Sequence, residues 1–370
     1  DLMPVEGWVL HHEITKNMGV CSWCRISVLQ YNVEMEKTTS GAWVCPECAP
    51  ALTKCTSCDG VTMGNMCGGC DEFYSVTNDY GTKAPKFWFF NIFKGKLKKT
   101  ASEESGHGKR VRAFYMGDEH EVENYNTETN YKNAEEVRNS YQDELFYTTE
   151  DSSLERGFEM HTHPATHKTH IKRNWDGMAY IRENGARSYD TSTAGLHVHL
   201  NRNAFTNWHF LKFLKFLMDN IAITLAVGRR KNMDNLNAYA RFDFRFYHDT
   251  QRKIARGMRD AKRDGRTYPH NPVVSGSGRG AINLRNEKTI ELRFMGGSLE
   301  EEKYKAKLDY IQALYEYTHD SSHRNQSPSD FADFVAKQKN RFRYLTKELK
   351  TDVFKRALKF PAETPNALTY

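Results

Sequence analysis

Three short segments of the chain carry ionisable side chains at every second residue: Glu119, Glu121 and Glu123 in the first, His197 and His199 in the second, Glu291 and Arg293 in the third. Because side chains alternate along a β-strand, each set faces one side of a sheet. Carboxylates this close repel one another unless cations lie between them. Carboxylates with an imidazole suit a hard cation, and an arginine suits phosphate oxygens. The segments predict metal-assisted phosphoryl transfer; the alternative is a solvent-facing sheet with incidental charges.

The elements that must position these residues are short strands alternating with longer helices. Strands are expected near 111–124, 145–149, 157–162, 196–201, 281–284 and 289–294, and helices near 167–184, 205–227, 299–318, 328–337 and 343–358. In the strands, Leu196 and Val198 oppose the histidines, and Leu292 opposes Glu291. The pattern predicts an α+β domain with an antiparallel or mixed sheet, one face charged and one apolar, and helices on one side.

All eight cysteines fall into C-x-x-C pairs near the start of the chain: Cys21/Cys24, Cys45/Cys48, Cys55/Cys58 and Cys67/Cys70. Each pair can present two thiolates to a tetrahedral zinc ion, and two pairs complete a site. We therefore predict two structural zinc sites, each with four cysteine ligands, in a ribbon-like or treble-clef-like module. Pairing in chain order closes shorter loops, and a cross-braced pairing of first with third is the alternative. A disulfide framework would need a secreted context, which nothing in the sequence indicates.

Charge is distributed unevenly along the chain. Residues 1–72 contain four Lys or Arg against nine Asp or Glu, a net charge of −5, so the remainder carries +11. A phosphate backbone would be repelled by the acidic module, which favours protein contact over nucleic-acid binding there. Basic residues gather around 83–99 and again from Arg252 to Arg266. Each cluster is either a solvated surface or a site of attraction for a polyanion.

The 370 residues exceed one average domain. We expect a double zinc-binding module over 1–72, a basic and aromatic linker over 73–110, the sheet domain over 111–320, and C-terminal helices with a tail over 321–370. Hydrophobic content of 39% and charged content of 27% are ordinary for a soluble protein. No apolar run reaches about eighteen residues, so no membrane partner is expected. His161, His163, His167 and His170 are either a further metal set or surface and pocket histidines.

Four motifs carry a resemblance to a known family: Gly-x-Glu-x-Glu at 117–121, Gly-Phe-Glu at 157–159, Gly-Leu-His-Val-His at 195–199 and Thr-Ile-Glu-Leu-Arg-Phe at 289–294. In this order and spacing they resemble the amidoligase family of carboxylate–amine ligases, many of them phage-encoded, which is related to glutamine synthetase and the glutamate–cysteine ligases. The resemblance covers about residues 111–320, with no counterpart for the cysteine-rich module. It implies a glutamine-synthetase-like fold. Because the sequence shows neither a membrane span nor a signal peptide, we expect a cytoplasmic protein, in the host cytoplasm if phage-encoded.

The resemblance also implies roles for individual residues. Glu119, His197 and Glu291 would hold the Mg²⁺ that bridges to the terminal phosphate of ATP. Glu121 and Glu159 would hold a second Mg²⁺ near the amine, with Asp151 as a third ligand where glutamine synthetase has a glutamate. Arg293 would stabilise the transferring phosphoryl group and His199 would lie near the nucleotide, whereas Arg279 and Asn283 would contact substrate or phosphate. Glu159, Glu291 and Arg293 are the catalytic candidates. His120 replaces the usual aliphatic residue between the two glutamates.

The implied reaction forms an amide through an acyl phosphate, from ATP and a small-molecule or peptide carboxylate and amine. No Gly-x-Ser-x-Gly elbow, P-loop or further cysteine competes with it. Gly276–Gly280 is expected to be a mobile loop that closes over substrate. Two other functions stay open: a non-catalytic, zinc-containing structural or protein-interaction protein, perhaps viral, and an enzyme or binder acting on nucleic acid.

Overall fold

The computed structural model divides the chain into two compact units, Asp1–Pro85 and Lys86–Tyr370, which are described separately. The residues whose placement is described are 36–37, 43–44, 53–54, 61–62, 88–93, 96–101, 114–124, 132–137, 146–149, 151, 153–154, 157–189, 191, 193–230, 236, 238–266, 280–322 and 326–360. Before residue 114, only the backbone of the strands is described.

The first unit contains two small antiparallel pairs of strands. β1 (Glu36–Lys37) pairs with β2 (Trp43–Val44), and β3 (Thr53–Lys54) pairs with β4 (Val61–Thr62). The predicted zinc ligands all lie outside the described residues: Cys21, Cys24, Cys45, Cys48, Cys55, Cys58, Cys67 and Cys70. Zinc binding by this unit, and the pairing of its cysteines, therefore stay predictions.

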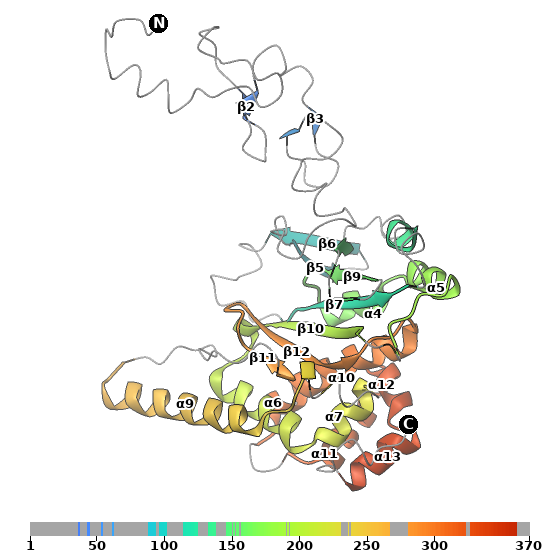
Figure 1. Ribbon diagram of the computed structural model, residues 1–370. Helices are drawn as coiled ribbons and strands as arrows, with labels where there is room; N and C mark the ends of the chain where they lie inside the picture. Colours follow the sequence, from blue (N-terminus) through green and yellow to red (C-terminus); the bar gives the residue numbers. More distant parts are fainter. Residues whose placement is uncertain are drawn as a thin grey trace, which may run out of the picture. The chain divides into compact units, whose positions relative to one another are not determined.

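The second unit is built on a six-stranded sheet in the order β11-β12-β10-β7-β9-β8, in which every neighbouring pair is antiparallel. The strands are β7 (Met116–Glu123), β8 (Phe146–Thr149), β9 (Gly157–Thr162), β10 (Gly195–Asn201), β11 (Ile282–Asn283) and β12 (Thr289–Gly296). Together with the helices packed on it (Figure 1), this sheet confirms the predicted α+β class.

The register of the sheet brings the charged positions of different strands together. His197 pairs with Glu119, His199 with Glu291, and Glu121 with Glu159. Between β10 and β12 the register shifts at Leu196/Val198, so that two residues of β12 lie opposite one of β10. Such a bulge re-aims side chains and is common next to active sites. Arg293 of β12 lies at this irregularity.

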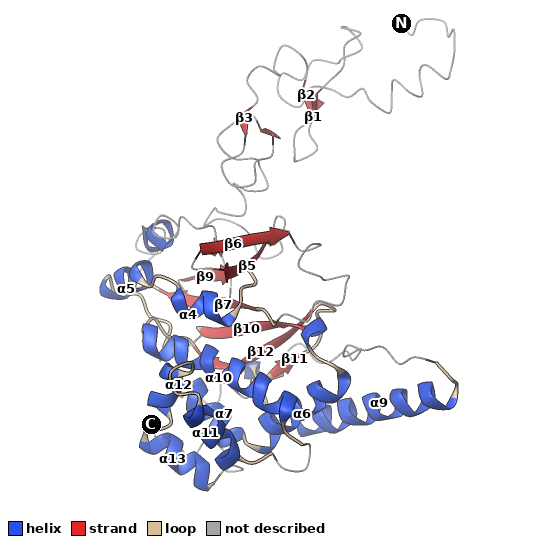
Figure 2. Cartoon of the chain, turned by 180° about the vertical axis from the view of Figure 1, so that it is seen from behind, coloured by secondary structure: helices blue, strands red, loops and turns tan. Residues whose placement is uncertain are grey.

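The helices cover one side of the sheet in Figures 1 and 2. They are α4 (His167–Lys172), α5 (Asp176–Glu183), α6 (Asn207–Asp219), α7 (Ile221–Gly228), α9 (Phe244–Arg263), α10 (Glu301–Asp320), α11 (Pro328–Lys337), α12 (Arg343–Glu348) and α13 (Asp352–Lys359), with a 3-10 turn η3 (Arg202–Ala204). None of the helices in the described residues is long and apolar enough to cross a lipid bilayer. Leu196, Val198 and Leu200 of β10 are fully buried, each contributing about 1.5–3 kcal/mol.

The helix-facing side of β7 is more polar than the predicted apolar face. Asp118 is buried and accepts a hydrogen bond from the Tyr304 hydroxyl at 2.7 Å. His120 stacks on the Tyr304 ring with centroids 5.6 Å apart, and its Nε2 accepts the Ser298 N–H at 3.3 Å. Burial lowers the pKa of His120 to about 3, so the ring is neutral. His120 thus replaces an aliphatic residue by joining a polar network with α10.

Three helices predicted as continuous are each broken in two, and the breaks follow side chains that compete for the backbone. Between α4 and α5, the Asn174 side chain accepts the Asp176 N–H at 2.8 Å. Between α6 and α7, Asn220 adopts non-helical dihedrals and donates its side-chain N–H to Phe216 O at 2.9 Å. Between α12 and α13, the Thr351 hydroxyl caps the second helix by accepting the Phe354 N–H. The predicted helix over 328–337 is confirmed, with Ser327 as its cap.

Several described elements were not predicted, among them a hairpin and a long helix of the second unit. β5 (Trp88–Phe93) and β6 (Lys96–Ala101) form an antiparallel hairpin within the stretch expected to be a linker. α9 forms where only a basic cluster was noted, starting at Asp243, whose side chain accepts the Phe246 N–H at 3.0 Å. Its buried residues Tyr247, Thr250, Ile254 and Ala261 recur at helical spacing, a signal that the sequence prediction did not use.

His209, buried where α6 packs on α10, predicts that the stability of the protein depends on pH. Burial lowers the pKa of His209 to about 3, and its Nε2–H donates to Tyr315 O at 2.9 Å. Below about pH 6.5, this histidine binds a proton in the unfolded chain but not in the folded chain. Stability is therefore lost as pH falls from about 6.5 to about 3, by up to about 1.4 kcal/mol per pH unit.

His209→Gln keeps a donor for Tyr315 O but cannot titrate. In urea unfolding between pH 6 and pH 4, we expect the wild-type free energy of unfolding to fall more steeply than that of the variant, by up to about 1.4 kcal/mol per unit. Parallel pH profiles for the two proteins would contradict the assignment.

Candidate metal centre

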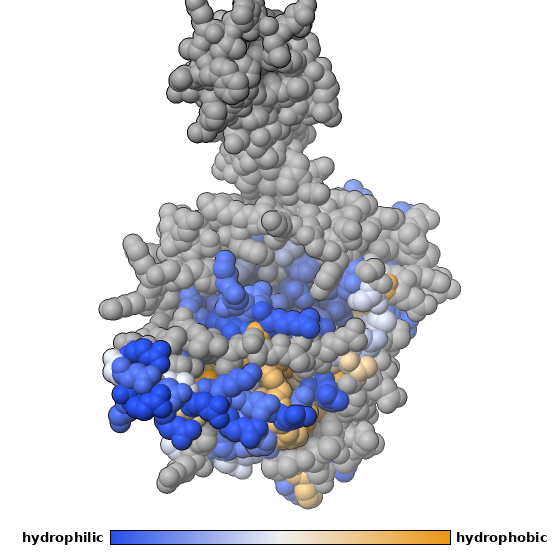
Figure 3. All heavy atoms as spheres, turned by 60° about the vertical axis from the view of Figure 1, so that its left-hand side comes forward, coloured by the Kyte–Doolittle hydropathy of each residue, from blue (hydrophilic) through white to orange (hydrophobic). Residues whose placement is uncertain are grey.

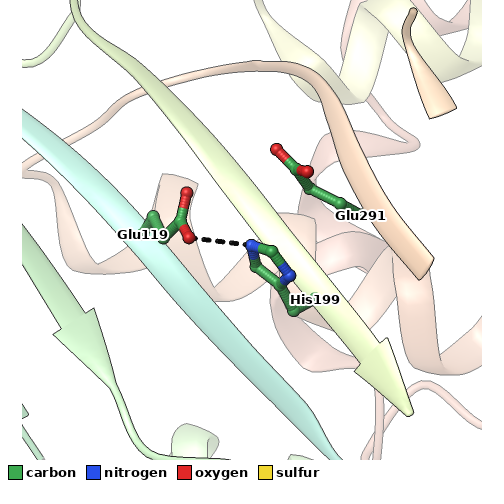
Figure 4. A group of neighbouring side chains, drawn as sticks. All are labelled: Glu119, His199 and Glu291. Atoms are coloured by element: carbon green, nitrogen blue, oxygen red, sulfur yellow. Dashed lines mark ion pairs between the residues drawn. The ribbon is translucent and has the colours of Figure 1, made fainter. Parts of the chain in front are cut away.

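Two groups of potential metal ligands lie on the sheet face that points away from the helices. One consists of Glu119, His199 and Glu291, and the other of Glu121, Asp151 and Glu159. Within each group, one ligand atom from every residue lies within 4.8 Å of the others. Figure 4 shows the first group, with its three side chains converging from three neighbouring strands.

In the first group, each carboxylate is oriented by neighbours. His199 Nε2 lies 2.9 Å from Glu119 Oε1, and its Nδ1 lies 3.2 Å from the Thr289 hydroxyl. Asn283 Nδ2 donates to Glu291 Oε2 at 2.6 Å, and Arg293 Nη1 donates to Glu291 Oε1. Asn283, expected near substrate or phosphate, thus supports a metal-ligand candidate directly. Arg279 lies outside the described residues.

His197 lies between the two groups. Its Nδ1 is 3.2 Å from Glu119 Oε2 and 3.8 Å from Glu291 Oε1, and its Nε2 is 3.7 Å from Glu121 Oε1. The expected first set combined His197 with Glu119 and Glu291. The structure groups His199 with Glu119 and Glu291 and leaves His197 in contact with both groups, so either imidazole lies close enough to bind a cation held by Glu119 and Glu291.

In the second group, the predicted trio comes together from two strands and a loop. Glu121 Oε2 accepts the Gly195 N–H. Asp151, in the loop after β8, is fixed by the Ser153 N–H at 2.8 Å and the Ser153 hydroxyl at 2.6 Å. Glu159 Oε2 lies 3.1 Å from His161 Nε2. Glu121 and Glu159 are buried, so their charges are poorly screened.

The pKa values reflect this crowding of carboxylates and imidazoles. Burial alone would raise the pKa of Glu119, but the charges and hydrogen bonds of His199 and His197 hold it well below its usual value. Burial would lower the pKa of His199, yet Glu119 and Glu291 raise it to about 9. Burial raises the pKa of Glu159. Protonated imidazoles thus supply the positive charge that the carboxylates need.

The donor set fits Mg²⁺. Five carboxylates and an imidazole provide many hard oxygen ligands and no thiolate, which suits Mg²⁺ or Mn²⁺ better than zinc. Their outer partners, Asn283, Ser153 and the Gly195 N–H, are of the kind that fixes ligand orientation. Closely spaced carboxylates on one rigid sheet face can hold two cations and the phosphates that bridge them.

The sequence prediction missed two residues of the site. His161 is two residues after Glu159 on β9, stacks on Tyr147, and was considered only with His163, His167 and His170. Those four do not converge: His167 binds Asp309 at 2.8 Å and His170 binds Met116 O at 2.8 Å. The alternation of Glu159 and His161 was the available signal. Arg230, buried at the end of α7, donates to Arg293 O at 3.2 Å, and no strand pattern indicated it.

Comparison with known proteins identifies the family of this chain. Residues 91–315 match the family described as "Putative amidoligase enzyme". Among curated proteins nothing matches the chain. Among solved structures, the chain is similar to one in "Crystal structure of the complex between Prokaryotic Ubiquitin-like Protein Pup and its Ligase PafA", at 10% identity and a TM-score of 0.31. That match covers 70% of this chain and 65% of the other, less than two thirds of its length.

A substitution at Gly195 tests whether Glu121 helps to bind a cation in the second group. A Cβ at this position would lie 3.1 Å from Arg230 Nη1 and 3.3 Å from Glu121 Oε2. Because both atoms end side chains, they can move, so Gly195→Ala should change the free energy of unfolding by under about 1.5 kcal/mol. Displacing Glu121 should weaken Mg²⁺ binding about 10- to 100-fold in calorimetry. Glu121→Gln gives the reference for losing that ligand, and wild-type affinity in Gly195→Ala would refute the geometry.

Proposed function

Because the chain belongs to the amidoligase family, we propose that it is an ATP- and Mg²⁺-dependent carboxylate–amine ligase with a glutamine-synthetase-like site. The observation that supports this most is the pair of carboxylate groups side by side on one sheet face, with His197 in contact with both and Arg293 against Glu291. Phosphoryl transfer needs cations at the phosphates and an arginine at the developing charge.

In this proposal the two groups hold two Mg²⁺ ions. Glu119, Glu291 and one of the two histidines would hold the ion at the terminal phosphate of ATP, and Glu121, Asp151 and Glu159 the second ion. Bound Mg²⁺ would neutralise the phosphates and polarise the transferred phosphoryl group. The second imidazole would remain near the nucleotide, which reconciles the roles expected for His197 and His199.

The chain's own groups would then serve two steps. A carboxylate oxygen of the substrate attacks the γ-phosphorus, the bond to the bridging oxygen breaks and ADP leaves, with Arg293 stabilising the transferring group. The amine next attacks the acyl carbon, releases phosphate and loses a proton, for which we propose Glu159 as the acceptor. Asn283 and Arg293 orient Glu291 throughout. No covalent link to the enzyme is needed.

A catalytically silent sheet is the weaker alternative. If the charges were incidental, the carboxylates would be solvated and far from one another, because burying an unpaired carboxylate costs free energy. Here Glu121, Glu159 and Glu291 are buried at 6%, 3% and 7% exposure and converge. For the N-terminal unit we retain two structural zinc sites formed by its eight cysteines and contact with a protein partner as part of the proposal.

The proposal predicts that ATP and Mg²⁺ give ADP and phosphate only when a suitable carboxylate and amine are present. Screening amino acids and short peptides as carboxylates, with ammonia and lysine as amines, would identify a pair in a coupled ADP assay. Arg293→Ala should then lower kcat by about 10³-fold or more, and Glu291→Gln should abolish turnover.

Glu302→Gln is the matched control, because it makes the same change at an exposed position of α10 that pairs with Lys347. It should retain wild-type turnover, and both variants should unfold cooperatively. Undiminished ADP formation by folded Glu291→Gln would exclude the site assignment.

A further inference from the structure

Helix α9 projects from the second unit as a long, exposed element (Figures 1 and 2). It contains seven Arg or Lys and two Asp. Its buried residues are Tyr247, Thr250, Ile254 and Ala261, which form one narrow face toward the body. Figure 3, which brings this side of the molecule forward, shows hydrophilic side chains gathered over the helix. Neither the metal centre nor the reaction proposed above uses this surface.

Five arginines form a single stripe on the face opposite the buried residues. They are Arg245, Arg252, Arg256, Arg259 and Arg263, at spacings of seven, four, three and four residues. At 100° per residue these positions fall within an arc of about 60°, and at 1.5 Å per residue they span about 27 Å. All five are exposed, with 73% of the Arg252 side chain and 72% of the Arg263 side chain accessible.

Neighbouring carboxylates neutralise only part of the stripe. Arg252 pairs with Asp249, and Arg263 pairs with Asp260 at 3.3 Å and Asp264 at 2.9 Å. Among the described residues, Arg245, Arg256 and Arg259 make no ion pair. Exposed pairs of this kind contribute little to stability. The helix therefore retains a row of charges that the fold itself does not require.

We propose that the arginine stripe of α9 binds the phosphate backbone of a nucleic acid. Arginine presents a planar fork of donors that matches phosphate oxygens, and all five stripe positions are arginine although Lys253 and Lys262 lie beside them. A helix about 10–12 Å in diameter fits a DNA major groove about 12 Å wide. Along about 27 Å, a duplex presents about sixteen phosphate charges.

The composition of the exposed face favours nucleic acid over an acidic protein. Within about 40° of the stripe on either side, the helix adds only His248, Asp249, Ala255 and Asp260. The large exposed apolar side chains of the helix, Phe244 and Met258, lie about 90° or more from the centre of the stripe. Protein interfaces need an apolar centre, whereas nucleic-acid interfaces are polar and strongly positive. The arginine stripe is polar and strongly positive, as nucleic-acid interfaces are.

Fluorescence anisotropy with the full chain tests this proposal. The probes are labelled duplex DNA, duplex RNA and single-stranded DNA of random sequence, long enough to span the stripe, in about 50 to 200 mM salt. Four or five phosphate contacts predict a slope of log K against log salt of about −3 to −5. Comparing the three probes distinguishes duplex from single-strand binding. Arg256→Gln with Arg259→Gln should reduce the slope by about 2 and the affinity by at least about 10-fold.

Arg356→Gln with Lys359→Gln on α13 is the matched control, because it removes two exposed positive charges elsewhere and should bind as wild type. Circular dichroism verifies α9, since glutamine and arginine have similar helix propensity. An unchanged slope and affinity in the α9 variant would overturn the proposal. So would competition by polyglutamate as effective as that by unlabelled duplex at equal charge, because it would indicate an acidic protein partner.

Discussion

Repulsion between carboxylates confined to one face of a rigid sheet is the constraint on which the rest of this structure depends. Glu119, Glu121, Glu159 and Glu291 are brought together by the register of four strands and cannot move apart without breaking it. Positive charge must therefore lie among them. His161, His197, His199 and Arg293 supply it, and their hydrogen bonds and raised imidazole pKa values follow from that requirement. In catalysis, bound cations would supply this positive charge and attract the phosphates.

The opposite face of the sheet holds this register in place. Slipping a strand by one residue would move its carboxylates into the helix layer and its leucines into the site. Leu196, Val198 and Leu200 resist this by packing, and the Asp118–Tyr304 and His120–Ser298 hydrogen bonds resist it by geometry, since each needs one partner on or next to α10. The helices behind the sheet thus determine the precision of the site in front of it.

Much of this arrangement can be predicted from alternation in the sequence, because a period of two determines which side chains share a face. That reasoning places Glu119 with Glu121 and His197 with His199. The grouping of Asp151 with Glu121 and Glu159 was implied by the family resemblance instead, and the three lie together in the structure. Alternation cannot rank two histidines on the same face. His199 lies closer to Glu119, at 2.9 Å against 3.2 Å for His197, whereas His197 contacts Glu291 at 3.8 Å. Arg230 follows the end of α7, where no period applies, whereas α9 carries a helical period in its buried residues and its arginines that the sequence prediction did not use.

The central claim is that the two carboxylate groups form adjacent cation sites, and Mn²⁺ electron paramagnetic resonance tests it most directly without a known substrate. With a non-hydrolysable ATP analogue, the full chain should bind two Mn²⁺ ions, the second producing a spin-coupled signal because the sites adjoin. A Glu119→Gln and Glu159→Gln double variant should lose both ions while remaining folded. Equal Mn²⁺ binding by the wild type and this variant would contradict the account.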